Sequence, residues 1–550
     1  MARTPLFDDI HRELGVARFC EARRLSTDDG RAIADEIGRR CAGRRRTRRE
    51  WLQFVGSTGL VGAVASVASR NQPLRAAAAS RASARIAIVG AGLAGLACAD
   101  ALAERGIVAT VYDANERTGG RCWSLRGFFP GQVAERGGEF IDTPHKTMLR
   151  YAKRFGLALE DVTKKAGETS YFFDGRAVAE AEVIEEFRAF VPVLHADLRR
   201  LSNEVTALSP TSVDMAVDRT SLAEYLDGSN ALGIPAGPIA KAAITSAYLG
   251  EYGLETDEQS CLNLLMFIHA DRRSKFTPFG VFSDERYHVA DGNDRIVEGL
   301  TAALPRSVQL GMQVVAARRT GAGAIELTFA GPGAPPPQTH DVVVFAIPFT
   351  VLRTVALDAS LGIPAAQRAA IDNLGYGANA KLLVGFDGRP WAAQGSNGTA
   401  YSDLPDHQLS WETNRVNSSA SRAVVTDYAS GDRGASLDPA LVQAATEAFL
   451  DDFDRVYPGA AAVASRRGDG SAIAHLEHWP SNPLALGSYT CYRPGQFTSI
   501  AGLEGAPAGN VYFAGEHANS FYEWQGFMEG AALSGVDVAA AILRGMKKAG

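Results

Sequence analysis

Three glycines and an aspartate are spaced as a dinucleotide-binding turn requires. Gly90, Gly92 and Gly95 follow a short apolar run and lead into a segment with helical spacing. In such a turn the first glycine allows the sharp bend, the second lets the backbone approach a pyrophosphate, and the third lets helix and strand pack closely. The pyrophosphate would accept hydrogen bonds at the positive end of the helix. Asp113 lies 18 residues beyond Gly95, near the spacing of about 20 expected for a carboxylate that binds ribose hydroxyls.

A strand–helix–strand unit must position these residues. Apolar runs at 86–89 and 107–112 predict two buried strands, and residues 93–105 between them have helical spacing. The triplet Gly119-Gly120-Arg121 follows the second strand and favours a flavin over a nicotinamide. Because all parts occur in the required order, we interpret the segment as the start of a dinucleotide-binding domain.

A second strand–glycine–helix unit lies near the other end of the chain. Residues 510–517 have the pattern of a strand and a glycine turn that ends in Glu516-His517, and a helical pattern runs from Gly526 to about Arg544. Two such units at opposite ends of the chain imply a discontinuous cofactor domain whose parts meet in space. The second helix would direct N–H groups, including that of Met528, at a bound flavin, where they stabilise negative charge.

Charge is distributed unevenly along the chain. Residues 1–75 hold 15 arginines and 9 acidic residues, whereas the remainder holds 41 basic and 53 acidic residues. Nucleic-acid binding by the folded part is therefore not expected, because its net negative charge repels phosphate. The six cysteines are scattered without a CxxC pair, so we expect neither a metal site nor a disulfide framework.

The first 84 residues resemble a basic leader with an export signal. Arg48-Arg49 precedes a mildly apolar stretch at 54–68, and residues 66–68 have the small side chains of a cleavage site. This pattern is typical of a twin-arginine signal for the periplasm, and the stretch is shorter than the ~20 residues of a stable membrane span. A disordered basic tail on a cytoplasmic protein is the alternative. The 46 residues ahead of the signal are many, so translation from a downstream start codon is also open.

Five motifs together resemble those of the FAD-dependent amine oxidase superfamily, which includes monoamine oxidases, polyamine oxidases, L-amino acid oxidases and flavin-dependent histone demethylases. They are GAGLAG at 90–95 with Asp113, GGR at 119–121, AIP at 346–348, FAGEH at 513–517 and GFMEGA at 526–531. The resemblance covers residues 85–545 and implies FAD as the cofactor. One departure is Asp113, where many relatives carry Glu, and either residue can bind ribose hydroxyls.

The resemblance also implies the fold. We expect class α/β, with a Rossmann-like (GR2-type) FAD-binding domain that is discontinuous in sequence and an α+β substrate domain with a mixed sheet and helices. Helical spacing over 180–270 and apolar runs at 381–386 and 423–428 agree with the second domain. The expected boundaries are 1–84 for the leader, 85–157, 287–349 and 485–545 for the FAD-binding domain, and 158–286 and 350–484 for the substrate domain.

The resemblance assigns roles around the cofactor. Glu516 would bind the diphosphate–ribityl part of FAD, Arg121 would lie near the pyrophosphate, and the Val314 backbone near the adenine. In mammalian monoamine oxidases a cysteine at the position of Ser488 is tethered to the flavin, so the resemblance implies non-covalent FAD here. The expected FAD-binding residues are Gly90, Ala91, Gly92, Leu93, Ala94, Gly95, Asp113, Ala114, Gly119, Gly120, Arg121, Val314, Gly515, Glu516, Gln525, Gly526, Phe527 and Met528.

Three residues are expected to act at the flavin. The segment around Lys381 resembles the family stretch whose lysine holds a water against flavin N5, where a cation favours oxygen reduction. The alternative is a lysine that extends from an apolar strand to the surface. Tyr489 and Phe527 resemble two aromatic walls that guide an amine toward the flavin, and helix core is the alternative for Phe527.

The implied reaction is oxidation of a primary or secondary amine to an imine by hydride transfer to flavin N5. Oxygen would be reduced to hydrogen peroxide, and water would hydrolyse the imine to an aldehyde and ammonia or an amine. An L-amino acid oxidase, giving a 2-oxo acid, is the first alternative, although Trp123 stands where those enzymes tend to have an arginine for the α-carboxylate.

A flavin-dependent desaturase or isomerase, which would not need Lys381, is a more distant alternative, and a non-catalytic FAD-binding protein is less favoured still. Glu523 would either bind the distal amine of a diamine or be a solvated loop carboxylate. A homodimer is left open.

Overall fold

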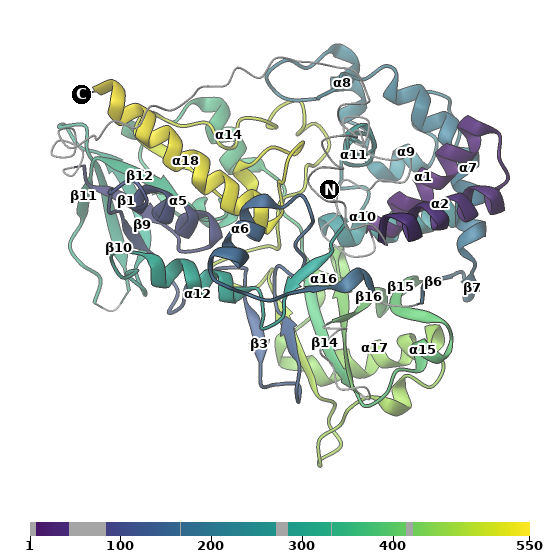
Figure 1. The fold of residues 1–550 in the computed structure, drawn as a ribbon. Coiled ribbons are helices and arrows are strands. Elements are labelled where there is room, and N and C mark those ends of the chain that lie inside the picture. Colours follow the sequence, from purple (N-terminus) through teal and green to yellow (C-terminus); the bar gives the residue numbers. More distant parts are fainter. Residues whose placement is uncertain are drawn as a thin grey trace.

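The computed structural model describes residues 7–42, 84–164, 167–270, 284–331, 333–413 and 422–549. Figure 1 shows a small sheet with the long C-terminal helix α18 on one side of the molecule, a large sheet below, and a group of helices that includes the N-terminal pair on the other side. Within the described residues, no helix is long and apolar enough to span a membrane. The same residues contain no group of three or more His, Cys, Asp or Glu side chains placed to hold a metal ion.

A four-stranded parallel sheet joins three distant parts of the chain. Its order is β19 (Val511–Phe513), β12 (Val342–Phe345), β1 (Ile86–Val89) and β2 (Thr110–Tyr112). All four residues of β1 are buried, as expected for a central parallel strand. Because β19 lies in the same sheet as β1, the prediction that both chain ends meet in one cofactor domain is confirmed.

Two helices of this domain pack with their backbones in close contact. They are α5 (Leu93–Ala103) and α18 (Met528–Ala549), and α6 (Lys146–Arg154) and α12 (Asp294–Ala303) pack nearby. A Cβ atom at Gly535 would lie 2.0 Å from the carbonyl oxygen of Ala94, and one at Gly95 would lie 1.9 Å from that of Gly90. Glycine at both positions is what allows α5 to approach its own turn and the C-terminal helix.

Smaller elements complete this side of the molecule. A second sheet has the order β11 (Gln338–His340), β10 (Ile325–Ala330), β9 (Gln313–Arg319) and β13 (Ala356–Leu357). Nearby in the chain, α13 (Phe349–Leu352) and α14 (Ala365–Asn373) pack on each other. Two further pairs are β3 (Ser124–Arg126) with β4 (Val133–Glu135), and β5 (Leu159–Asp161) with β8 (Tyr287–Val289).

A seven-stranded mixed sheet forms the base of the second domain. Its order is β18 (Ala474–His478), β14 (Ala380–Phe386), β17 (Ala423–Ala429), β16 (His407–Thr413), β15 (Ser396–Leu404), β6 (Glu168–Phe173) and β7 (Arg176–Val178). The runs at 381–386 and 423–428 are the paired strands β14 and β17, as predicted. Three helices contact strands of this sheet: α15 (Pro390–Ala393), α16 (Gly431–Ser436) and α17 (Val442–Val456).

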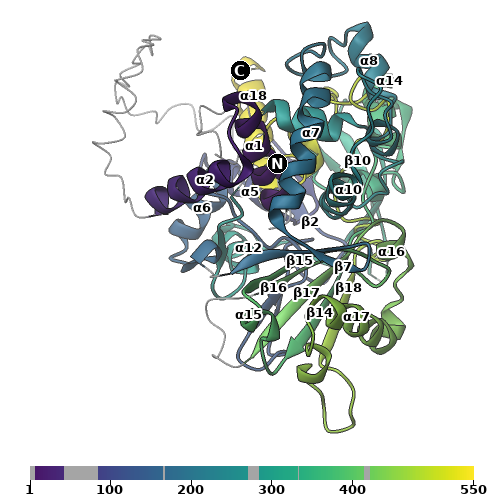
Figure 2. The same ribbon diagram turned by 90° about the vertical axis from the view of Figure 1, so that its right-hand side faces the viewer.

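The helical spacing over 180–270 is confirmed by five helices. They are α7 (Glu180–Leu198), α8 (Ser212–Asp218), α9 (Leu222–Leu226), α10 (Pro238–Tyr252) and α11 (Leu262–Ala270). Figure 2, turned by 90°, shows α7, α8 and α10 above the large sheet, with α7 beside α1.

The N-terminal region requires a correction. Residues 1–84 were expected to be a leader, but α1 (Phe7–Arg23) and α2 (Thr27–Ala42) pack on the second domain, with α1 against α7 and α10. Their apolar residues belong to the same buried cluster as those of α7. The expected signal, Arg48-Arg49 with the stretch 54–68, lies outside the described residues.

Candidate active site

A cavity of about 230 Å³ lies between the parallel sheet and the large sheet. It is lined from both domains, so the residues expected to bind the cofactor and those expected to act on a substrate share one space. Of the residues predicted from the sequence, those that line it are Gly90, Gly92, Leu93, Ala94, Asp113, Ala114, Gly119, Gly120, Arg121, Val314, Lys381, Tyr489, Gly515, Glu516, Gly526, Phe527 and Met528. Ala91, Gly95 and Gln525 lie behind this surface and do not line it.

The glycine turn leaves open space where a pyrophosphate would lie. Gly90 has φ +107°, a conformation that favours glycine, and a Cβ atom there would be 2.5 Å from the carbonyl oxygen of Ala346. A Cβ atom at Gly92 would meet no atom of the described chain within 4 Å. The first glycine is thus required by the protein itself, whereas the space that a side chain at Gly92 would fill is open, and Gly92 lines the cavity.

Asp113 is held in place by its own turn. Its carboxylate accepts hydrogen bonds from the N–H of Ala91 at 2.6 Å and of Asn115 at 2.8 Å. Burial raises the pKa of Asp113, while these two N–H groups oppose the shift. The side chain lines the cavity beside the glycine turn, which is the place for a carboxylate that binds ribose.

Arg121 and Glu516 bind each other across the cavity wall. Arg121 Nη1 lies 3.0 Å from Glu516 Oε1 and also donates to the carbonyl oxygen of Ser488 at 2.6 Å. Thr490 donates to the other carboxylate oxygen of Glu516. The pair joins the GGR turn to the C-terminal glycine turn on one side of the site.

His517 is a functional candidate that the sequence analysis did not single out, although it ends the FAGEH motif. It lines the cavity, is fully buried, and packs 4.2 Å from the Phe349 ring. Neither ring nitrogen has a hydrogen-bond partner among the described residues. Burial lowers its pKa to about 4, so the ring is neutral at pH 7 and has one donor and one acceptor to offer.

The site therefore fits the FAD that the sequence motifs imply. A buried imidazole without partners is costly unless a polar ligand supplies them, and the open space at Gly92 lies in the same cavity. Met528 also lines the cavity at the N-terminal end of α18, where N–H groups favour negative charge.

Lys381 does not extend to the surface but enters the cavity wall, where it is 5% exposed. Its ammonium group donates to Glu139 Oε2 at 2.7 Å and to the carbonyl oxygens of Gly137 at 2.9 Å and Glu135 at 3.2 Å. An ammonium has three N–H donors, so each has an acceptor within the protein. A water held by Lys381 would have to replace or share one of these acceptors.

Glu139 is the second residue that the sequence analysis missed. Its other oxygen accepts hydrogen bonds from Trp411 Nε1 at 3.0 Å and Thr413 Oγ1 at 3.2 Å. It lies in the stretch 137–142, just after β4, and the local sequence does not indicate its partner. The carboxylate therefore links Lys381 to the aromatic wall of the cavity.

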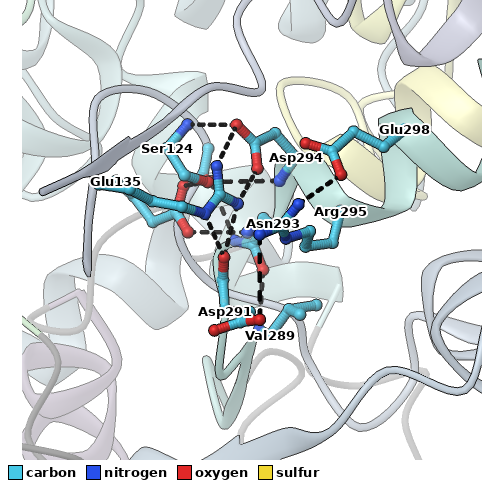
Figure 3. A network of polar contacts seen from close by, with 10 residues as sticks. Ser124, Glu135, Val289, Asp291, Asn293, Asp294, Arg295 and Glu298 are labelled. Atoms are coloured by element: carbon cyan, nitrogen blue, oxygen red, sulfur yellow. Dashed lines mark hydrogen bonds and ion pairs between the residues drawn. The ribbon is translucent and has the colours of Figure 1, made fainter. Parts of the chain in front are cut away.

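A polar network around Asn293 holds the segment that carries Glu139. Figure 3 shows Asn293 in this network with Ser124 and Glu135. The side-chain amide of Asn293 donates to the carbonyl oxygens of Gly138 and Glu139, and its backbone N–H donates to Glu135 Oε1 at 2.8 Å. Ser124 donates to the other oxygen of Glu135. Burial raises the pKa of Glu135 to about 7. The network fixes the backbone whose carbonyl groups accept from Lys381.

Three aromatic side chains form the wall beside Lys381. Tyr489 and Tyr428 share a hydrogen bond of 2.8 Å between their hydroxyl groups, and Tyr489 also donates to the carbonyl oxygen of Gly250 in α10. The Trp411 ring lies 5.3 Å from that of Tyr428. Phe527 also lines the cavity and packs on His145 and Trp524. Tyr428 and Trp411 are additions to the predicted walls.

Three further positions can now be placed. Trp123 does not line the cavity but lies between the guanidinium groups of Arg117 and Arg136, so this position does not distinguish amine from amino acid substrates. Glu523 is exposed and accepts a hydrogen bond from Asn519, as expected for a solvated loop carboxylate. Ser488 lines the cavity and donates to Asn379, so it offers no thiol for a flavin tether.

Comparison with known proteins places similar chains among oxidases. Curated L-amino-acid oxidases from Bungarus fasciatus and Siganus canaliculatus are 22% and 23% identical to the chain; each alignment covers 84% of the chain, and 87% and 85% of the respective relative. The solved structure of cyclohexylamine oxidase from Brevibacterium oxydans IH-35A has a TM-score of 0.70 at 20% identity. That of wild-type putrescine oxidase bound to putrescine has a TM-score of 0.67 at 18% identity. Each match covers 84% of this chain and 99% of the other chain. At such identities the structural likeness shows the fold alone.

A family model goes further than these pairwise likenesses. The model described as flavin containing amine oxidoreductase matches residues 93–543, a span that includes most of the cavity-lining residues. The protein is thus an oxidoreductase with FAD as its cofactor, and the chain belongs to the family of flavin-containing amine oxidoreductases.

Proposed function

We propose that the protein is an FAD-dependent oxidase of primary or secondary amines, giving an imine that hydrolyses to an aldehyde and ammonia or an amine. When bound, FAD supplies the acceptor for a hydride from the amine α-carbon and passes the electrons to O2, which forms hydrogen peroxide. The chain supplies binding, orientation and exclusion of water.

The observation that supports this proposal is that the cationic side chains lining the cavity already have partners within the protein. Arg121 is paired with Glu516, and Lys381 is paired with Glu139. Arg117 donates to the carbonyl oxygens of Thr118 and Gly120 and stacks on Trp123. Among the described residues that line the cavity, each cation is already engaged, so none is available to bind an α-carboxylate.

The substrate side of the cavity also favours an uncharged amine. The Lys381–Glu139 pair has no net charge, and the aromatic wall of Trp411, Tyr428 and Tyr489 stands beside it. Transfer of an ammonium or a carboxylate into such surroundings costs more than transfer of a neutral amine. Tyr489 and Phe527, with Lys381 near the reacting centre, would orient the amine.

An L-amino acid oxidase is the second candidate, because curated relatives from Bungarus fasciatus and Siganus canaliculatus carry that name. A panel of matched pairs separates the two: each L-amino acid is compared with the amine formed by removing its carboxylate, and peroxide formation is measured. Cyclohexylamine and putrescine are added as further amines. We expect kcat/KM to be at least about tenfold higher for the amine of each pair, since a buried unpaired carboxylate costs more than about 1.4 kcal/mol. The opposite order within the pairs would establish the amino acid activity.

We also propose export to the periplasm through the predicted twin-arginine signal. The support is the sequence of residues 48–68 alone. Cell fractionation of the wild type beside an Arg48→Lys, Arg49→Lys variant tests it. Equal periplasmic amounts of both proteins would exclude this route.

A further inference from the structure

The N-terminal helices lie outside the matched family region, which begins at residue 93, yet they are built into the second domain. Ile10, Leu14, Ala17 and Cys20 of α1 are each at most 3% exposed and share a buried cluster with Phe187 of α7. This apolar face has the 3–4 residue spacing of a helix that packs on a core. Helices α1 and α2 are referred to below as the N-terminal hairpin.

Charged contacts surround this apolar face. Arg12 of α1 and Arg31 of α2 both lie 2.6 Å from Glu180, the first residue of α7. Arg188 of α7 lies 2.9 Å from Glu21. One carboxylate thus binds both helices of the hairpin, and a second ion pair fixes the register of α1 along α7.

The hairpin also reaches the helix that supports the cavity wall. The His11 ring packs 4.3 Å from Phe267, and its Nε2 lies 3.2 Å from the hydroxyl oxygen of Tyr248 in α10. Two residues further along α10, the carbonyl oxygen of Gly250 accepts hydrogen bonds from Tyr489 at 3.1 Å and from Asn379 at 2.9 Å. His11 therefore contacts α10 at Tyr248, and the same helix binds the Tyr489 hydroxyl group through the carbonyl group of Gly250.

We propose that the N-terminal hairpin is a permanent brace of the substrate domain, which stays bound when the chain between it and β1 is cut and which positions Tyr489 through α10. The partner of the α7–α10 face is this chain's own residues 7–42. The statement about Tyr489 rests on the proposed amine oxidation, whereas the statement about binding does not.

The binding statement is tested on the full chain with a specific protease site inserted between residues 43 and 83. After cleavage we expect the hairpin fragment to elute with the remainder in gel filtration and the melting temperature to stay unchanged. An uncut sample of the same protein is the control. Elution of the fragment separately from the remainder would overturn the proposal, whatever the activity of the protein.

The positioning statement is tested with His11→Phe, which keeps a ring against Phe267 but removes the hydrogen bond to Tyr248. We expect KM for the amine to rise about threefold to tenfold, as for a small displacement of a substrate-orienting group, with the flavin absorption spectrum unchanged. Ala22→Ser, on the exposed side of α1, is the matched control and should match the wild type. An unchanged KM in His11→Phe would overturn the positioning of Tyr489 by the hairpin. Absence of any amine oxidation in the wild type would refute the proposed function instead, and the gel-filtration result would still stand.

Discussion

Lys381 and Glu139 are 242 residues apart in the chain and form a buried ion pair, with 2.7 Å between Nζ and Oε2. Each partner is 6% exposed or less. Removal of one partner from such a pair leaves an uncompensated buried charge, which typically costs 3–5 kcal/mol. Substitution of either residue therefore leaves the charge of the other unpaired.

Replacement of Lys381 by Met tests whether the cation serves oxygen reduction. We expect flavin reoxidation by O2 to slow by on the order of 10- to 100-fold, because a positioned charge that stabilises developing negative charge has effects of this size. Flavin reduction by the amine should change much less. Stopped-flow absorbance at the flavin band measures both half-reactions.

The matched control for this variant is Lys381→Met combined with Glu139→Gln, which removes both charges and so leaves none unpaired. Slow reoxidation in both variants assigns the effect to the cation. Reoxidation at the wild-type rate in both would contradict the oxidase assignment and favour a desaturase or isomerase.

His517→Phe tests whether the buried imidazole binds FAD. The variant keeps an aromatic ring beside Phe349 but has no ring nitrogen, so we expect FAD affinity to fall about tenfold, the equivalent of one hydrogen bond of about 1.4 kcal/mol. Fluorescence titration of the apoprotein with FAD measures the Kd. His475→Phe, a histidine that does not line the cavity, serves as control. Equal FAD affinity in His517→Phe and the wild type would exclude this role.

Gly92→Ala and Gly95→Ala separate ligand contact from protein packing. A Cβ atom at Gly95 would overlap the carbonyl oxygen of Gly90, whereas one at Gly92 would meet no atom of the described chain. We expect Gly95→Ala to lower apoprotein stability by about 1–3 kcal/mol. Gly92→Ala should leave apoprotein stability unchanged but weaken FAD binding at least about tenfold, because the added methyl occupies the pyrophosphate space. Denaturant unfolding of the apoproteins and FAD titration give the two quantities; the reverse pattern would place the cofactor elsewhere.

Glu13→Gln tests the buried carboxyl of the N-terminal hairpin. Burial, and then the nearby Glu180, raise the pKa of Glu13 well above its ordinary value, although a hydrogen bond from Tyr171 and the charge of Arg12 oppose the shift. In the unfolded chain this carboxyl ionises near its ordinary pKa. Wild-type stability should therefore fall as the pH rises from that value toward the raised one, by about 1.4 kcal/mol per unit of difference.

Glutamine keeps an acceptor for Tyr171 but cannot ionise. We expect Glu13→Gln to melt at a higher temperature than the wild type at pH 8, with the difference shrinking toward pH 5. Thermal unfolding across this pH range measures it. A difference that grows toward acid pH would show that the carboxylate, rather than the neutral acid, is the form bound in the fold.

Local patterns in the sequence were enough for the cofactor side of the molecule. The turn at Gly90 and Gly92 and the FAGEH segment are fully encoded within short stretches, because backbone conformation and helix periodicity depend on neighbouring residues. The apolar runs at 381–386 and 423–428 likewise predicted β14 and β17. The strand–glycine units at both chain ends predicted that their strands share one sheet.

The arrangement of the substrate side depends on contacts between distant parts of the chain. Lys381 was identified from its local motif, but its partner Glu139, the aromatic wall of Trp411 and Tyr428, and the lack of partners at His517 arise from strands that meet across hundreds of residues. The same holds for the N-terminal hairpin: its place ahead of the arginine pair and the apolar stretch suggested part of a leader, whereas its buried apolar face and Glu180 place it in the core of the second domain. Composition and spacing report what a segment can do locally, and which charges and faces become paired depends on the packing of the whole chain.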